Sequence, residues 1–200
     1  MSARTRLVVG LGNPGSEYTW TPHNLGFLVV DRLAERAGAR IERPEAKAYI
    51  GRAKLAGHEV VLAKPQTFMN ASGMAVAELV RRLDADPAEM IVVADDVALP
   101  WGMLRIRERG SSGGHNGLES ILGALGTDEF IRVRVGIRPE HPVRDLAAYV
   151  LMQLPKADRE DVLEIASEAA DAVELILAEG AKKAMSKFNR RVPPDEGSVT

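Results

Sequence analysis

The stretch LVVGLGNPG, residues 7–15, decides how this chain begins to fold. Leu7 to Leu11 is an apolar run ended by glycine, which is typical of a buried strand. Asn13 therefore falls just beyond the carboxyl end of a strand, where ligands collect in open α/β sheets. The same letters, GLGNPG, also match the GxGxxG pattern of dinucleotide-binding proteins.

The residues after this pattern argue against a dinucleotide site. Such a site needs a helix that runs straight on from the glycines, followed by a strand that ends in an acid. Here SEYTWTPHNLG has no helical apolar period and contains Pro22 and Gly26. The segment FLVVD, ending at Asp31, belongs to a helical pattern that continues beyond it. We therefore expect no nicotinamide or flavin cofactor.

The rest of the chain alternates between helical and extended patterns. The helical spacing of Leu25, Leu28, Val29, Leu33 and Ala37 starts after Thr21–Pro22 and stops at Gly38, which puts His23 at a helix N-terminus. Helices are also predicted over 71–83, 118–125 and 158–179. Strands are predicted within 48–63 (a hairpin about Ala56–Gly57), over 90–94, at an edge over 103–107, and over 131–137 with one face in water.

This alternation indicates an α/β fold, a sandwich with helices on both faces of a mixed sheet. We expect one domain over residues 1–191 and a disordered tail over 192–200. The strand over 90–94 delivers Asp95 and Asp96 to its carboxyl end, the edge where Asn13 also falls.

Composition excludes several classes of protein. The 200 residues contain no cysteine, so there is no disulfide, thiolate–metal site or cysteine nucleophile. No stretch approaches the roughly 20 apolar residues of a membrane span, and the N-terminus lacks the longer apolar run of a secretory signal. We expect a soluble, cytoplasmic protein.

The net charge of −2 hides an uneven distribution. Residues 156–179 hold eight acids and two bases, whereas residues 181–194 hold five bases and no acid. Further arginines flank the glycine-rich stretch GSSGG: Arg105, Arg107, Arg109, Arg132, Arg134 and Arg138. Clustered bases fit either a polyanionic partner or an ordinary solvated surface, and charge alone leaves both open.

The stretch GSSGG, residues 110–114, also matches the GxSxG elbow of serine hydrolases, with Asp128 and His141 following in the order of that class. The strand leading into it would be RIRER, whose charges suit an exposed edge rather than the buried strand beneath a nucleophile. We therefore interpret this stretch as a mobile substrate loop at a helix start, and do not expect Ser112 to be a nucleophile.

The four histidines, His23, His58, His115 and His141, lack close metal-ligand spacing, so no metal is predicted. His58 and His141 suit surface or capping positions. His23 and His115 are each followed by asparagine in a glycine-containing context. A histidine, an acid and carboxamides in loops are the groups needed to activate water against a carbonyl.

Together these segments resemble the bacterial peptidyl-tRNA hydrolase family. The shared motifs are GLGNPG with Tyr18 after it, TPHNLGF (21–27), KPQTFMN (64–70), DDVALP (95–100) and GSSGGHNGL (110–118). The resemblance covers about residues 7–189 and implies a single α/β domain with a twisted mixed sheet. It also implies cofactor-free hydrolysis of the ester between peptide and tRNA, by a monomer with no obligate protein partner.

The resemblance also implies roles for particular residues. His23 would be the catalytic base and Asp95 its orienting partner. The peptide and ester would be bound by Asn13, Tyr18, Phe68, Met69, Asn70, His115 and Asn116. Arg107 and Arg134 match basic positions associated with tRNA phosphates.

Two positions depart from the family pattern. Pro22 stands where the family commonly has arginine, and Ala98 where it commonly has an acid. Two other functions stay open at this point: an RNA-binding protein that has lost catalysis, and a generic esterase without an RNA partner. The intact set of Asn13, His23, Asn70, Asp95 and Asn116 argues against the first.

Overall fold

The computed structural model describes residues 4–190, which form a seven-stranded sheet covered by helices. The strands are β1 (Arg6–Gly10), β2 (Arg43–Glu45), β3 (Ala48–Leu55), β4 (His58–Pro65), β5 (Ile91–Asp96), β6 (Leu104–Arg107) and β7 (Ile131–Gly136). The α-helices are α1 (Leu25–Arg36), α2 (Ser72–Leu83), α3 (Asn116–Leu125), α4 (Leu146–Val150), α5 (Arg159–Glu179) and α6 (Ala181–Phe188). The tail predicted over 192–200 lies outside the described residues.

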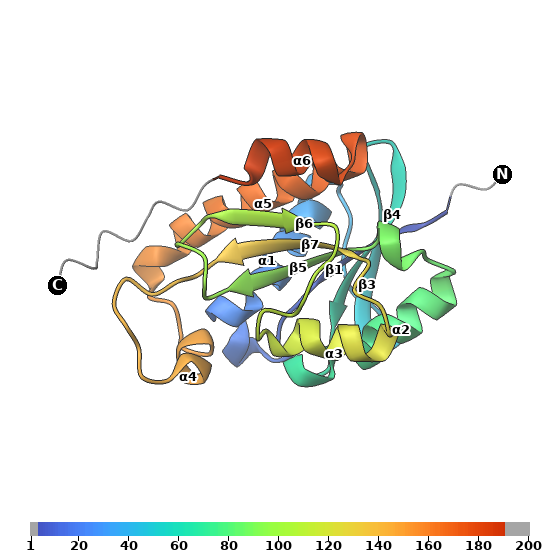
Figure 1. The fold of residues 1–200 in the computed structure, drawn as a ribbon. Coiled ribbons are helices and arrows are strands. Elements are labelled where there is room, and N and C mark those ends of the chain that lie inside the picture. The colour runs from blue at the N-terminus through green and yellow to red at the C-terminus, as the bar shows by residue number, and fades with distance from the viewer. Residues whose placement is uncertain (1–3, 191–200) are drawn as a thin grey trace.

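The sheet has the order β2-β3-β4-β1-β5-β7-β6 (Figure 1). The four inner strands β4, β1, β5 and β7 are parallel, and β2, β3 and β6 pair with their neighbours antiparallel. The predicted mixed sheet is therefore confirmed, as is the position of β6 at an edge. The short edge strand β2 and the helices α4 and α6 were not predicted.

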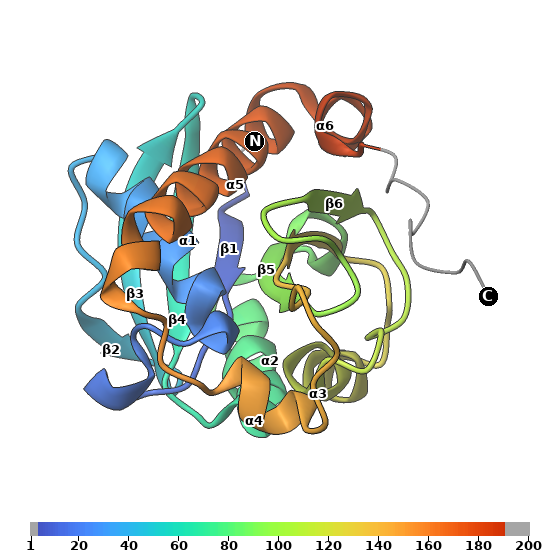
Figure 2. The ribbon, with the colours of Figure 1, turned by 90° about the vertical axis from the view of Figure 1, so that its left-hand side faces the viewer.

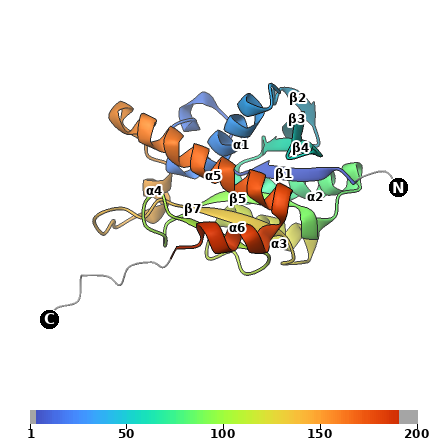
Figure 3. The same ribbon diagram turned by 90° about the horizontal axis from the view of Figure 1, so that it is seen from above.

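Two apolar cores lie on opposite faces of the sheet because successive side chains of a strand point in opposite directions. Val8 and Val93 join the core under α1, α5 and α6, and their neighbours Val9 and Val92 join the core under α2 and α3. In Figure 1 the sheet runs between α5–α6 above and α2–α3 below, and Figure 3 shows α5 and α6 lying over the strands. The predicted helices on both faces are thus confirmed.

The hairpin between β3 and β4 turns where the sequence predicts it. Ala56 and Gly57 have φ of 48° and 80°, and positive φ at both central residues is what the type I′ turn of a two-residue hairpin requires. Leu55 and His58 pair directly across the turn.

The prediction that one face of the strand over 131–137 is in water is wrong. Arg132 is 0% exposed, and the side chain of Arg134 is largely buried. The reason is tertiary: the guanidinium groups of both residues donate hydrogen bonds to carbonyls of the Gly110–Gly114 loop, which covers this face.

A close contact between two glycines places the start of α1 against β1. A Cβ on Gly10 would lie 2.1 Å from the carbonyl oxygen of Gly26, and a Cβ on Gly26 would lie 2.5 Å from that of Val93. Only glycine permits this approach at both positions. It brings the 3-10 turn Pro22–Asn24, which precedes α1, to the carboxyl ends of β1 and β5, the edge that Figure 2 turns toward the viewer.

Candidate active site

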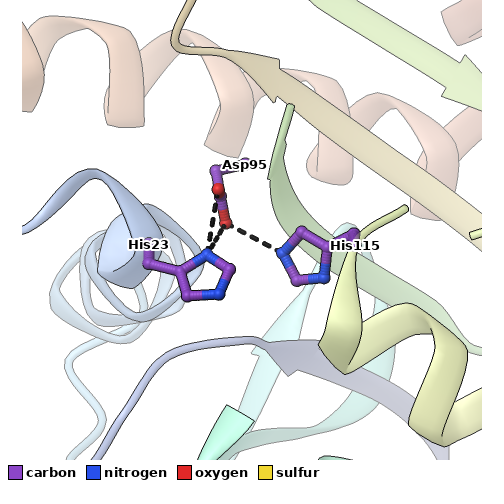
Figure 4. Close-up of side chains that lie close together, drawn as sticks. All are labelled: His23, Asp95 and His115. Atoms are coloured by element: carbon purple, nitrogen blue, oxygen red, sulfur yellow. Dashed lines mark hydrogen bonds and ion pairs between the residues drawn. The ribbon is translucent and has the colours of Figure 1, made fainter. Parts of the chain in front are cut away.

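Asp95, near the carboxyl end of β5, receives two histidines from different elements (Figure 4). His23 Nδ1 lies 2.9 and 3.0 Å from the two Asp95 carboxylate oxygens, and His115 Nε2 lies 2.9 Å from Asp95 Oδ1. The two rings are 4.8 Å apart between centroids. All three side chains are almost fully buried, so these contacts are shielded from water and worth more than on a surface.

His23 has one ring nitrogen bound and one available. Its Nδ1 donates to the Asp95 carboxylate, which accepts only, so the neutral imidazole carries its proton there. Nε2 makes no hydrogen bond within residues 4–190 and points away from Asp95 (Figure 4). An unprotonated nitrogen in that position can accept a proton.

His115 has both ring nitrogens bound. It is the N-cap of α3: its Nδ1 accepts from the backbone N–H groups of Gly117 and Leu118, at 3.1 and 3.3 Å. Nδ1 must therefore be unprotonated, and Nε2 carries the proton donated to Asp95. The ring is held in place and has no nitrogen left for a substrate.

Asp95 stays ionised despite its burial. Burial opposes the negative charge, but the attraction to His115 and the hydrogen bonds from both imidazoles outweigh it. The pKa of Asp95 is accordingly held well below its ordinary value. The carboxylate is a fixed negative charge beside the His23 ring.

Asn24 ties the GLGNPG turn to the turn that carries His23. Its side-chain oxygen accepts from the Asn13 backbone N–H at 2.8 Å, and its amide donates to the Asn13 carbonyl at 2.9 Å. Asn13 in turn accepts from the Met69 backbone N–H through Oδ1, at 2.8 Å. The GLGNPG turn, the turn that carries His23 and the segment at Met69, 56 residues beyond Asn13, are therefore joined.

A cleft of about 160 Å³ opens beside the two histidines. Its wall includes His23, Asp95, His115, Asn116 and Arg134. The rest of the wall is formed by Asp96, Val97, Gly113 and Gly114, and by Leu146, Ala147 and Val150 of α4. The structure thus brings five of the predicted site residues to one cleft, with acceptor, donor and cationic groups side by side.

The other predicted site residues surround this centre less closely. Asn13 lines a neighbouring hollow, and Met69 is buried beside it. Asn70 is exposed in the 3-10 turn before α2, and Phe68 is 62% exposed. Tyr18 is half-buried, and its carbonyl accepts from Thr21. Their substrate roles stay predictions.

Arg107 is exposed on the edge strand β6 and does not line the cleft. The register pairs it with Arg132, and pairs Arg105 with Arg134. Four arginines consequently share one face of the β6–β7 pair, and Arg105 joins the two that the family resemblance indicates.

The alternative with Ser112 as nucleophile lacks the necessary contacts. The Ser112 hydroxyl is buried and accepts from the Gly114 N–H. Asp128 lies near Arg109 instead, and His141 is exposed. No histidine side chain within residues 4–190 is hydrogen-bonded to the Ser112 hydroxyl.

His23, Asp95 and His115 are also the group of described residues best placed to hold a metal ion, since their ligand atoms lie within 4.8 Å of one another. The nitrogens that face Asp95 already donate protons to it, however, so a metal would have to displace both. The absence of a metal stays a prediction.

The two departures from the family pattern fit their local structure. Pro22 opens the Pro22–Asn24 turn, a position that suits its fixed φ. Ala98 is exposed, and its N–H donates to the Asp96 side chain. Neither Pro22 nor Ala98 lines the cleft beside His23 and Asp95.

Sequence reasoning missed the roles of Asn24 and Arg132. Asn24 carries the only local signal, because a carboxamide directly after His23 can pair with a neighbouring backbone. The sequence signal at Arg132 was misleading, since an arginine in a strand of alternating apolar and polar residues ordinarily faces water.

The family model and the similar proteins found by comparison all point to the same family. The model of the family described as peptidyl-tRNA hydrolase matches residues 7–195. The peptidyl-tRNA hydrolase of Koribacter versatilis is 54% identical over 192 residues, which cover 96% of each chain. That of Solibacter usitatus is 50% identical over 187 residues, covering 94% of this chain and 95% of the other.

A solved structure agrees. The crystal structure of peptidyl-tRNA hydrolase from Acinetobacter baumannii matches with a TM-score of 0.85 and 32% identity, covering 96% of this chain and 97% of that chain. Between Arg4 and Arg190, no helix is long and apolar enough to cross a membrane.

Proposed function

The chain belongs to the peptidyl-tRNA hydrolase family, and on that basis we propose that it cleaves the ester between peptide and tRNA with water activated by His23. The observation that carries this proposal is the asymmetry of the His23 ring: Nδ1 is fixed by Asp95, and Nε2 has no partner among the described residues. A base must have a free lone pair in a defined direction, and His23 alone of the two buried histidines offers one.

The reaction begins with proton transfer from water to His23 Nε2. The water oxygen bonds to the ester carbonyl carbon as the proton leaves, and the Asp95 carboxylate stabilises the imidazolium that forms. The bond from the carbonyl carbon to the ribose oxygen then breaks. The ribose oxygen takes the proton from His23, which releases free tRNA and the peptide acid.

Carboxamides supply the remaining polar contacts. The Asn116 side chain lies in the cleft wall, and Asn13 keeps its Nδ2 without a partner among the described residues. Either N–H₂ group can donate to the oxyanion or to the peptide backbone, together with Asn70. One oxyanion donor is worth about 3 kcal/mol in comparable sites.

The β6–β7 arginines support a polyanionic substrate. Like charges directly opposite each other across two strands are destabilising, yet Arg105 faces Arg134 in register. Arg134 is partly balanced by Asp96 at 3.6 Å, while Arg105 and Arg107 have no acidic partner within residues 4–190. Phosphates of the tRNA would supply the missing counter-charge to Arg107 and Arg134.

The first test compares His23→Ala with His58→Ala on a peptidyl-tRNA substrate. We expect His23→Ala to lose about 10² to 10⁴ in kcat, the usual contribution of a general base. His58→Ala is the matched control, since His58 begins β4 at the opposite end of that strand from the site. Near-normal turnover by folded His23→Ala would reject the assignment.

A second test separates this function from a generic esterase. Binding through phosphate contacts weakens steeply as salt rises, because condensed counterions are released. We expect tRNA affinity to fall steeply between low and moderate salt. A nearly flat salt dependence would favour an esterase without an RNA partner.

A further inference from the structure

Arg132 is a fully buried cation that forms no salt bridge within residues 4–190. It lies in β7 at 0% exposure, and its guanidinium packs 4.1 Å from the centre of the Phe130 ring. Burying a charge is costly unless it is well hydrogen-bonded. The cost of burying this charge suggests that the Arg132 guanidinium has a specific role at this position.

The Arg132 guanidinium links two segments through backbone carbonyls. Nη1 donates to the carbonyls of Gly110 and Ser111, at 2.6 and 3.3 Å. Nη2 donates to the carbonyls of Asp128 and Phe130, at 2.5 and 3.0 Å. One arm holds the glycine-rich loop, and the other holds the turn between α3 and β7, so the rigid fork fixes the distance between them.

The loop held in this way leads directly to the site. Arg134 adds a bond of 2.6 Å to the Ser111 carbonyl, and its Nη1 occupies the space that a Cβ on Gly113 would need. The Ser112 carbonyl accepts from the His115 N–H. His115 then donates to Asp95, and Asn116 lies in the cleft wall. The chain of contacts runs from Arg132 through the loop to both residues.

We propose that Arg132 is a positioning residue that clamps the Gly110–Gly114 loop from beneath and so sets His115 and Asn116 for the reaction. The proposal rests on the proposed function for its kinetic part. Arg132 itself does not line the cleft, so it acts through the loop rather than on the substrate.

The environment of Arg132 shows why a neutral residue would not serve. Burial, with a smaller contribution from Arg134, lowers the pKa of Arg132 to about 10, so the group remains cationic at neutral pH. Nε is buried without a hydrogen-bond partner among the described residues. The four bonds to carbonyls are therefore charge-assisted, and these are stronger than neutral ones.

The test compares Arg132→Met with Val133→Ala, well below their melting temperatures. Val133 is the next residue of β7 and points into the opposite core, so its truncation weakens the fold without touching the loop. Arg132→Met should speed amide hydrogen exchange over residues 110–117 at least 10-fold. It should also lower kcat and raise KM, with a loss in kcat/KM of about 100-fold, the scale of a misplaced site.

Arg132→Lys serves as the conservative variant. It keeps the charge but not the fork, so it should recover part of the exchange protection and part of kcat/KM. If Arg132→Met does not fold, hydrogen exchange and kcat/KM are measured on Arg132→Lys instead, and these two results test the proposal. Unchanged exchange and KM in the folded variant, or equal changes in Val133→Ala, would overturn the proposal. Inactive wild-type protein would instead reject the proposed function, and the exchange result would still test the clamp.

Discussion

Two turns of this protein each present a histidine to the same carboxylate. The turn before α1 carries His23 and the loop before α3 carries His115, and both rings bond Asp95 at 2.9 Å. Their other ring nitrogens differ. The Nδ1 of His115 is taken by two backbone N–H groups at the start of α3, and the Nε2 of His23 has no partner in the described part of the chain.

This difference shows that the surrounding backbone assigns the role of a histidine. At the start of α1 the preceding 3-10 turn moves His23 ahead of the helix, and no side chain caps the helix end. At the start of α3 the ring itself is the cap. The same side chain is thus a base in one turn and a support for Asp95 in the other.

Asp95→Asn should have the largest effect. An amide in this position turns one N–H toward an imidazole that is already a donor, so His23 is driven to the tautomer with its proton on Nε2. We expect kcat to fall by about 10³ to 10⁴, the size found where the same substitution imposes the wrong tautomer. Single-turnover rates measure this loss, and a circular dichroism spectrum checks that the variant is folded. A loss below tenfold would refute the orienting role of Asp95.

His115→Asn should cost much less. Asparagine is a good N-cap, so α3 keeps its start, while Asp95 loses one donor. One hydrogen bond to a charged group contributes about 1.5 kcal/mol, which corresponds to about a tenfold loss in kcat. The variant is compared with His23→Asn in the same assay. If the two lose equally, the distinction between the histidines fails.

The free energy of unfolding should depend on the ionisation of Asp95 at acidic pH. Because the pKa of Asp95 is depressed in the folded state, its ionised form stabilises the fold above the unfolded value of about 4. That stabilisation is lost as the pH falls toward the folded pKa, by at most about 1.4 kcal/mol per pH unit. Denaturant unfolding of wild type and Asp95→Asn should therefore converge below pH 4. A constant difference between pH 4.5 and pH 3 would contradict this.

Arg107→Ala should have the smallest effect and leave the histidine pair untouched. If Arg107 contacts one phosphate, its removal makes the negative slope of log affinity against log salt less steep, by about one, and leaves kcat unchanged. Arg52→Ala, on an exposed position of β3 away from the β6–β7 arginines, is the control and should leave the slope as it is. Equal slopes for wild type and Arg107→Ala would remove Arg107 from the tRNA site.

Much of the fold could be predicted because its signals are local. The apolar runs that became β1 and β5, the turn at Ala56–Gly57 and the helical period of α5 depend on neighbouring residues alone. The strand β7 shows the limit. Its alternation of apolar and arginine residues fits a half-exposed strand, and only the loop folded over it reverses that interpretation for Arg132.

By itself, the sequence determined the chemistry that is present: histidines, an acid and carboxamides placed in turns beyond the carboxyl ends of predicted strands. Only the tertiary structure decided which groups meet. His23 and Asp95 are 72 residues apart in the chain, and His115 reaches the same carboxylate from the other side. Periodicity and turn residues report local conformation, whereas a hydrogen bond between distant segments exists only once the sheet has brought them together, and it is these bonds that distinguish the base from its support.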